Sequence, residues 1–448
     1  MISDVSHLDH ADDLAGPARR RAALAAVLGR DGIAVLAATP ERNRNNDVDY
    51  PYRANSDFRY LTGFVEPSAI AVLAPGAEIG EYIVFCRERD PAAETWIGKR
   101  AGTEGVAREY GADAAFPIDE FEARIGDLLA RRKTLYTTQG INPEFETQLL
   151  ARLNGLRARG RHAEPPETIV SLNSVVHEMR LIKDADEIAL MRQAAATSAA
   201  GHIAAMQAAE PGVMEYQLEA TLHYVYGLAG MHWAYPTIVG AGANGCILHY
   251  IENAAPLADG DLVLIDSGAE YRGYAGDITR TFPANGRFSD VQRRLYDIVL
   301  AANEAGIAAC TVGAPASAPH QAALAVLVDG LIALGFVTGD RQTVIENERY
   351  KPFFMHGTSH WLGMDVHDVG AYKKDGEWRP LAAGMVLTIE PGLYVPPGSE
   401  GIDEAYWGIG IRVEDDVVIT DDGPEVLTGD VPKTPDRIEA LMASNARS

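Results

Sequence analysis

The sequence predicts an α/β (α+β) protein with two domains, and three features support this prediction. The chain has 448 residues, which exceeds the size at which one hydrophobic core usually stops growing. Short apolar runs typical of buried strands alternate with helix-like stretches. A polar segment, residues 157–166, ends in two prolines. We therefore expect a small α/β domain over residues 1–173 and a larger domain over residues 174–448.

The first half contains three short runs rich in Ile, Val and Leu, at residues 33–38, 69–73 and 82–86. Their length and composition are typical of buried strands. Residues 20–28 and 121–131 have the pattern of helices. No cluster of catalytic residue types is evident in this half.

The second half begins with a helix that we expect to open at Asp184. Asp184 and Glu187 have the spacing of a capping box, in which each side chain binds an amide of the first turn. The pair Pro211-Gly212 is expected to end this helix. The expected strands lie at 262–266, 277–282 and 385–390, followed by one long strand over 409–420.

Composition excludes several classes of function. The net charge of −24 repels phosphate backbones, and no long run of Lys or Arg is present, so we expect no nucleic-acid partner. Three cysteines are too few for a disulfide framework. The first 17 residues lack an apolar signal region, and no apolar run approaches the ~20 residues of a membrane span. We expect no membrane association and a cytoplasmic location.

A glycine motif at residues 240–245 fits G-x-G-x-x-G and follows a strand-like run. A dinucleotide-binding site also needs a helix that opens at the third glycine. Residues 246–253 are followed by Pro256, which leaves little room for such a helix. We therefore interpret the motif as a tight loop.

Acidic residues at the ends of expected strands are the most informative feature. Asp266 closes one strand and Asp277 opens the next, so the two can converge if these strands pair. Glu390 ends the strand at 385–390. Because side chains alternate along a strand, Arg412 and Glu414 share one face.

Four carboxylates brought together repel one another and resist dehydration. Two divalent cations would balance their charge, and His360 is the candidate nitrogen ligand. Such an oxygen-rich set suits Mn²⁺, and the absence of cysteine argues against structural zinc. An acid at a strand end is more often an ordinary solvated turn residue, so the residues alone leave both interpretations open.

At these residues the chain resembles the Xaa-Pro aminopeptidases of the pita-bread metallopeptidase family. The segments that carry this resemblance are residues 245–250, 259–283, 356–370, 384–394 and 408–420. Residues 49–67 and 93–100 resemble the N-terminal domain of the same enzymes. The match is looser at 337–351 and 396–406. The resemblance implies a pita-bread catalytic domain after the small N-terminal domain.

The resemblance also implies five metal ligands and two Mn²⁺ ions per subunit, with other divalent ions possible. These ligands are Asp266, Asp277, His360, Glu390 and Glu414. Asp277 and Glu414 would bridge both ions. Asp266 would serve one ion, and His360 with Glu390 the other.

Further roles follow from the same resemblance. Glu390 is expected to take and pass the proton during catalysis. His367 is expected to hydrogen-bond the reacting carbonyl, and His249 and His356 to shape the proline pocket. All four are therefore candidate catalytic residues.

Four more residues match substrate-binding or supporting positions. Arg412 and Tyr394 match positions in or behind the pocket, although Arg412 could instead only hold Glu414 or a neighbouring acid by an ion pair. Trp96 and Asp47 match positions at the active-site mouth of a neighbouring subunit in a homo-oligomer, a tetramer or dimer. Ordinary core or interface packing is the alternative for Trp96.

The expected activity is release of the first residue from Xaa-Pro-Yaa peptides. A prolidase that prefers Xaa-Pro dipeptides would have the same ligands, and only the first half of the chain favours the aminopeptidase. An inactive binding protein with this fold is a third possibility, against which the complete ligand set argues.

Overall fold

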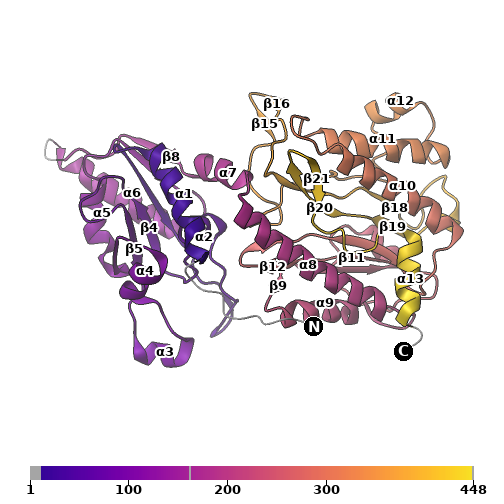
Figure 1. Ribbon diagram of the computed structural model, residues 1–448, viewed down its shortest axis with the longest axis horizontal. Helices are drawn as coiled ribbons and strands as arrows, with labels where there is room; N and C mark the ends of the chain where they lie inside the picture. Colours follow the sequence, from indigo (N-terminus) through magenta and orange to yellow (C-terminus); the bar gives the residue numbers. More distant parts are fainter. Residues whose placement is uncertain (1–11, 161–162, 446–448) are drawn as a thin grey trace. The chain divides into compact units, whose positions relative to one another are not determined.

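The structure, a computed structural model, describes residues 12–160 and 163–445. Contacts between Cα atoms divide the chain into two compact units, Met1–Arg180 and Leu181–Ser448. Both units mix helices with strands (Figure 1), as the sequence predicts. Helix α7 (Asn173–Leu181) spans the division, and the domain boundary near residue 173 stays a prediction.

The first unit is built on a six-stranded mixed sheet with the strand order β6-β5-β4-β1-β7-β8. Its strands are β1 (Gly32–Ala37), β4 (Ile70–Leu73), β5 (Tyr82–Cys86), β6 (Ala114–Pro117), β7 (Thr134–Thr137) and β8 (Thr168–Ser171). Its helices are α1 (Asp12–Leu28), α2 (Ser56–Thr62), α3 (Pro91–Ile97), α4 (Gly102–Tyr110), α5 (Phe121–Leu129) and α6 (Pro143–Ala158), and a hairpin joins β2 (Asn43–Asn45) to β3 (Val48–Asp49).

The strands and helices predicted for this unit are confirmed at β1, β4, β5, α1 and α5. Every residue of β1, β4 and β5 is buried. Strands covered on both faces need apolar side chains at all positions, which explains why their sequences show continuous apolar runs without alternation.

The second unit packs helices around several small antiparallel sheets. Its helices are α8 (Ala185–Ala208), α9 (Glu215–Leu228), α10 (Asp290–Ala308), α11 (Ala318–Ala333), α12 (Arg341–Glu346) and α13 (Pro435–Asn445). Its strands are β9 (His232–Trp233), β10 (Ile238–Ala241), β11 (Leu262–Asp266), β12 (Ala269–Tyr271), β13 (Tyr274–Ala275), β14 (Thr279–Pro283), β15 (Lys373–Lys374), β16 (Glu377–Trp378), β17 (Val386–Ile389), β18 (Gly392–Val395), β19 (Ile409–Arg412), β20 (Asp415–Thr420) and β21 (Gly423–Val426).

Helix α8 begins as the capping-box spacing predicts. The Asp184 carboxylate accepts a hydrogen bond from the Glu187 amide at 2.9 Å, and the Glu187 carboxylate accepts one from the Asp184 amide at 3.0 Å. The helix ends just before Pro211-Gly212, as expected. Among the described residues, no helix is long and apolar enough to cross a lipid bilayer.

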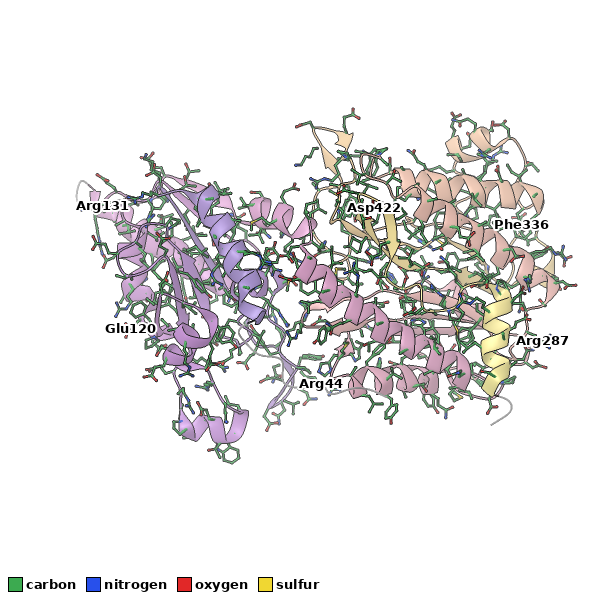
Figure 2. All side chains as sticks on the ribbon, viewed as in Figure 1. Arg44, Glu120, Arg131, Arg287, Phe336 and Asp422 are labelled. Atoms are coloured by element: carbon green, nitrogen blue, oxygen red, sulfur yellow. The ribbon has the colours of Figure 1, made fainter. Side chains whose placement is uncertain are left out.

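The main core of this unit lies between α8 and α9, α10 and α11, and the strands β10, β11 and β19. Side chains fill the space between these helices and strands, and the exposed Arg287 lies at the right-hand edge of the view (Figure 2). Strands β10, β11 and β14 form one sheet, β17 pairs with β20, and β18 pairs with β19. These pairings bring the ends of β11, β17 and β19 toward one region.

The prediction of one long strand over 409–420 is wrong. The segment forms β19 and β20, which pair with different partners and are separated by Val413 and Glu414. The Glu414 amide leaves the ladder and donates to the Thr279 carbonyl at 3.0 Å. The opposite strands, β17 and β18, are interrupted at Glu390 and Pro391, and proline has no amide hydrogen for a ladder. Both glutamates therefore stand at strand breaks.

The start of β14 also differs from the prediction, because the strand begins at Thr279 rather than at Asp277. The glycine motif, in contrast, forms the tight loop expected from its surroundings. A short 3-10 helix, Gly242–Cys246, follows β10. A Cβ atom on Gly410 would lie 2.1 Å from the Gly245 carbonyl oxygen, so these glycines permit a close approach of two backbones.

Burial of His202 predicts a pH dependence of stability. His202 in α8 is 0% exposed, and its Nε2 atom lies 2.9 Å from the Ser267 carbonyl. Burial lowers its pKa to about 4, even though the bond to Ser267 acts in the opposite direction. The unfolded chain binds this proton near pH 6.5 and the folded chain does not, so stability present above ~pH 6.5 is lost as the pH falls toward 4.

Replacing His202 with Gln keeps a donor for Ser267 and removes the titrating group. Urea unfolding at several pH values between 7 and 4.5 should show that the unfolding free energy of this variant falls less steeply as the pH is lowered. The difference between the two curves should reach ~3 kcal/mol over the whole window. Parallel curves for the two proteins would contradict the assignment.

Candidate metal centre

The five predicted metal ligands all line one cavity of about 480 Å³. Asp266 is the last residue of β11, and Asp277 lies two residues before β14, the antiparallel partner of β11. Glu390 and Glu414 stand at the two strand breaks described above. His360 comes from a loop that is bonded to β17, since the Thr388 amide donates to the His360 carbonyl at 2.9 Å.

Ligand atoms of Asp277, His360 and Glu414 lie within 4.8 Å of one another. His360 Nε2 is 3.5 Å from Asp277 Oδ2 and 3.7 Å from Glu390 Oε1. The other ring nitrogen, Nδ1, lies 3.0 Å from the Trp361 carbonyl. A hydrogen bond from Nδ1 to this carbonyl leaves Nε2 as the atom that faces the carboxylates, a common arrangement of ligating histidines.

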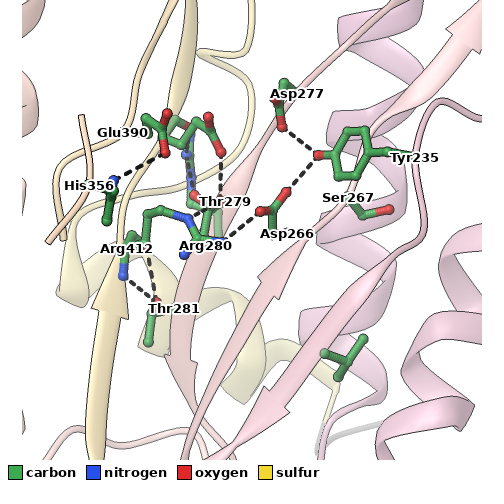
Figure 3. Close-up of polar contacts among 12 residues, drawn as sticks. Tyr235, Asp266, Ser267, Asp277, Thr279, Arg280, Thr281, His356, Glu390 and Arg412 are labelled. Carbon is green, nitrogen blue, oxygen red and sulfur yellow. Dashed lines mark hydrogen bonds and ion pairs between the residues drawn. The ribbon is translucent and has the colours of Figure 1, made fainter. Parts of the chain in front are cut away.

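Tyr235 also lies in the site, and sequence reasoning missed it. Its hydroxyl is 2.7 Å from Asp266 Oδ1 and 2.5 Å from Asp277 Oδ1, so it joins the two aspartates (Figure 3). One hydroxyl carries a single proton and can donate to only one carboxylate at a time. The sequence around Tyr235 holds no acid or strand-end pattern, so it carried no signal for this role.

Arg412 is held firmly behind the carboxylates. Its Nη2 atom forms an ion pair with Asp266 Oδ2 at 2.6 Å (Figure 3). Its Nη1 atom donates to the Tyr394 hydroxyl at 3.0 Å. Nε donates to Thr279 at 3.0 Å. Arg412 therefore holds a neighbouring acid, as one of the two interpretations stated, and that acid is Asp266 rather than Glu414.

The electrostatics of the site favour a cation. Burial raises the pKa of Glu414 well above its usual range, and the neighbouring carboxylates of Asp277 and Glu390 add to this effect. Burial raises the pKa of Glu390 to about 7 and also raises the pKa of Asp266. Divalent cations would stabilise the ionised forms of these acids, so the donor set fits hard metal ions.

Three further histidines surround the acids. His356 Nδ1 lies 3.6 Å from Glu390 Oε2, and its Nε2 lies 2.9 Å from the hydroxyl of the fully buried Tyr394. Burial lowers the pKa of His356 to about 3, so the ring is neutral. The ring of His367 lies 4.3 Å from that of His360, and His249 lines the same cavity. The structure thus brings all three together with the acids.

Two family models match this chain. The model of metallopeptidase family M24 matches residues 189–421, and that of the aminopeptidase P N-terminal domain matches residues 18–136. The chain is 45% identical over 429 residues to the Xaa-Pro aminopeptidase of Escherichia coli strain K12, covering 95% of this chain and 97% of the relative. This chain belongs to metallopeptidase family M24.

Solved structures agree with this membership of family M24. An aminopeptidase from Pseudomonas aeruginosa shares 49% identity with a TM-score of 0.95, covering 97% of this chain and 99% of its own. Aminopeptidase P from E. coli with the inhibitor Pro-Leu shares 43% identity with a TM-score of 0.94, covering 99% of this chain and 100% of its own. The pita-bread fold expected for the second half is confirmed, and a metallopeptidase of this family uses divalent metal ions.

Trp96 and Asp47 belong to the first unit, which is described by itself. Trp96 lies on α3 with 87% of its surface exposed, and Asp47 lies exposed in the turn between β2 and β3. Such exposure excludes packing of Trp96 into the core of its own chain. A role for either residue at the mouth of another subunit stays a prediction.

A buried ion pair anchors the M24 loop that carries His367. Lys183 Nζ lies 2.8 Å from a carboxylate oxygen of Asp368, and both side chains are 1% exposed. The Asp368 amide also donates to the Trp361 carbonyl at 2.8 Å. The residue before Asp368 is His367, and the residue before Trp361 is His360, so the pair secures both histidines.

Replacing Lys183 with Met should destabilise the protein strongly. Removal of one partner of a buried ion pair typically costs about 3–5 kcal/mol. Chemical unfolding of the variant measures this loss. The double variant Lys183→Met, Asp368→Leu should recover most of the stability, because it removes both charges. Equal stability of the wild type and the single variant would contradict the analysis.

Proposed function

We propose that this M24 metallopeptidase is an Xaa-Pro aminopeptidase that releases the first residue from peptides with proline in second position. One observation carries the proposal: all five ligand residues line a single cavity, with a partly apolar wall beside them. The names of the most similar relatives and the match to the aminopeptidase P N-terminal domain support the same activity.

We further propose that the site holds two Mn²⁺ ions. Asp277 and Glu414 would contact both, Asp266 one, and His360 with Glu390 the other. The set of four carboxylates and one imidazole is typical of hard ions. When bound, such ions lower the pKa of water toward ~7 and stabilise negative charge that develops on a carbonyl oxygen.

The protein's own groups would then position the substrate and move the proton. Glu390 lies between His356 and His360 and faces the cavity, which suits a group that accepts a proton and passes it to the proline nitrogen. His367 stands beside His360, where it can donate to the carbonyl before proline. Arg412 would hold Asp266, and the buried Tyr394 would orient His356.

The apolar side of the cavity suits a proline ring. Its residues are Pro236, Ile238, Leu248, Ile251 and Val366. His249 and His356 line the same cavity. A ring without a hydrogen on nitrogen gains from apolar contact and needs no acceptor at that atom.

A prolidase would use the same metal site, so peptide length must decide between the two activities. Hydrolysis of an Xaa-Pro dipeptide should be compared with that of an Xaa-Pro-Yaa tripeptide at equal concentration. The aminopeptidase proposal requires faster turnover of the tripeptide. A strong preference for the dipeptide would replace it with the prolidase.

An inactive binding protein is disfavoured because no ligand is missing. Metal analysis of the purified protein and an assay after addition of Mn²⁺ test this alternative. We also propose that the protein forms a tetramer or dimer in the cytoplasm and that Trp96 and Asp47 approach the site of a neighbouring subunit. The exposure of Trp96 and the three unpaired cysteines support these proposals.

Single substitutions of the ligands test the metal roles. Asp266→Ala and Glu414→Ala should each abolish turnover while leaving the circular dichroism spectrum of the fold intact. Each removes one carboxylate from a crowded site, and Glu390 and Glu414 keep negative charge near Arg412 when Asp266 is replaced, so loss of the fold is not expected. An active variant that binds no metal would refute the mechanism.

Mn²⁺ should raise the melting temperature of the metal-free protein. A ligand at a hundredfold excess over its Kd adds about 2.7 kcal/mol of stability per site when it binds only the folded state. Differential scanning calorimetry with increasing Mn²⁺ measures the shift, and Glu414→Ala should show a smaller one. An unchanged melting temperature in the wild-type protein would contradict the coupling.

A further inference from the structure

A buried polar cluster forms hydrogen bonds with the backbone at the two glutamates of the metal centre. Its members are Arg280, Asn303, Asp415, Thr428 and Lys433. Except for Lys433, whose side chain is 23% exposed, these residues have no accessible surface. None of the five lines the cavity, and the proposed chemistry uses none of them.

Asn303 connects the two strand breaks. Its Nδ2 atom donates to the carbonyl of Ile389 at 2.9 Å and to the carbonyl of Val413 at 3.2 Å. These carbonyls belong to the residues immediately before Glu390 and Glu414. A strand break leaves carbonyl groups without ladder partners, and buried carbonyls need a donor. One side chain of α10 supplies both bonds and thereby fixes the distance between the two breaks.

Lys433 determines which way the Asn303 amide faces. Its Nζ atom lies 2.8 Å from Asn303 Oδ1 and 2.8 Å from Asp415 Oδ2. An ammonium group only donates hydrogen bonds, so the amide oxygen must face Lys433 and the amide nitrogen must face the two carbonyls. Without Lys433 the amide could turn, and its oxygen would then repel the carbonyl oxygens of Ile389 and Val413.

Arg280 completes the support on the side of Glu414. Its Nη1 atom donates to the Thr279 carbonyl at 3.0 Å and to the Glu414 carbonyl at 2.5 Å. Its Nη2 atom pairs with Asp415 Oδ1 at 2.6 Å, and the Thr428 hydroxyl donates to the same oxygen at 2.8 Å. Asp415 thus joins the Arg280 and Lys433 ends of the cluster.

We propose that Asn303 and Lys433 are positioning residues that set the spacing of Glu390 and Glu414 and thereby the affinity of the site for divalent cations. This inference rests on the proposed metal-binding roles of the two glutamates. Lys433 touches neither ligand side chain; it acts through the Asn303 amide and the two backbone carbonyls. Partners that orient metal ligands typically change metal affinity by ~10–100-fold when they are replaced.

Two variants test the proposal from different sides. Asn303→Ala removes the bridge and leaves the Lys433–Asp415 ion pair in place. Lys433→Met keeps the bridge residue and removes the group that orients it. Lys351→Met is the matched control, because Lys351 is an exposed lysine that pairs with Glu348 at the surface. Lys433→Arg keeps a donor at this position and should therefore retain more of the metal affinity than Lys433→Met.

The measurement is Mn²⁺ binding to metal-stripped full-length protein by isothermal titration calorimetry, with urea unfolding of the same metal-free samples. Asn303→Ala and Lys433→Met should bind Mn²⁺ about 10–100-fold more weakly than the wild type. Added Mn²⁺ should restore much of kcat, while KM for the peptide should change little. The control should bind Mn²⁺ as tightly as the wild type.

The outcomes separate this inference from the function on which it rests. Wild-type affinity in both folded variants would overturn the positioning role and leave the metallopeptidase function intact. A wild-type protein that binds no divalent ion would overturn the proposed function itself. If Lys433→Met does not fold, Asn303→Ala, which leaves the buried charges paired, decides the question alone.

Discussion

The second unit depends on one constraint: four carboxylates are gathered in a mostly buried cavity where they repel one another. Burial is the largest cause of the raised pKa values of Glu414, Glu390 and Asp266, and repulsion between the carboxylates adds to it. A protein can keep such a group of acids ionised only by supplying positive charge. Arg412 supplies part of it next to Asp266, and divalent ions are the natural source of the rest.

The course of the backbone is also related to this crowding of carboxylates. Strands place side chains alternately on two faces, so an uninterrupted pair of strands would carry Glu390 and Glu414 within regular ladders. Interrupting both strands at these residues frees each glutamate to turn toward the cavity. The interruption leaves carbonyl groups without partners. Arg280 and Asn303 supply the missing donors, and Lys433 bonds to the Asn303 amide oxygen. The metal ligands and the hydrogen bonds that satisfy the backbone carbonyls next to them are thus parts of one arrangement.

Much of this arrangement could be predicted from the sequence. Apolar runs revealed β1, β4 and β5, because strands buried on both faces leave that pattern, and the Asp184–Glu187 spacing revealed the start of α8. The acids at 266 and 277 could be paired because β11 and β14 are near in sequence and antiparallel. The residues alone left a metal site undecided, and the resemblance to a known family was needed to name the ligands.

What could not be predicted depends on contacts between distant segments. The break at Glu414 could not be predicted, because the alternation of apolar and charged residues typical of a strand runs up to it, whereas the bond from the Glu414 amide to Thr279 is formed only in the fold. Tyr235 was missed because a phenol near two aspartates has no signature of its own. Lys433 was missed for the same reason, since its partners Asn303 and Asp415 are assembled only by the fold.

The long-range character of these contacts has a consequence for folding. The bond from Arg280 to the Glu414 carbonyl spans 134 positions, and that from Asn303 to the Ile389 carbonyl spans 86. Contacts so far apart in sequence form late, because large loops must close before they are gained. Helices such as α8 can form early from local signals, whereas the metal centre appears only when the last strands have paired. A partly folded chain therefore lacks the assembled metal centre and cannot cleave peptides.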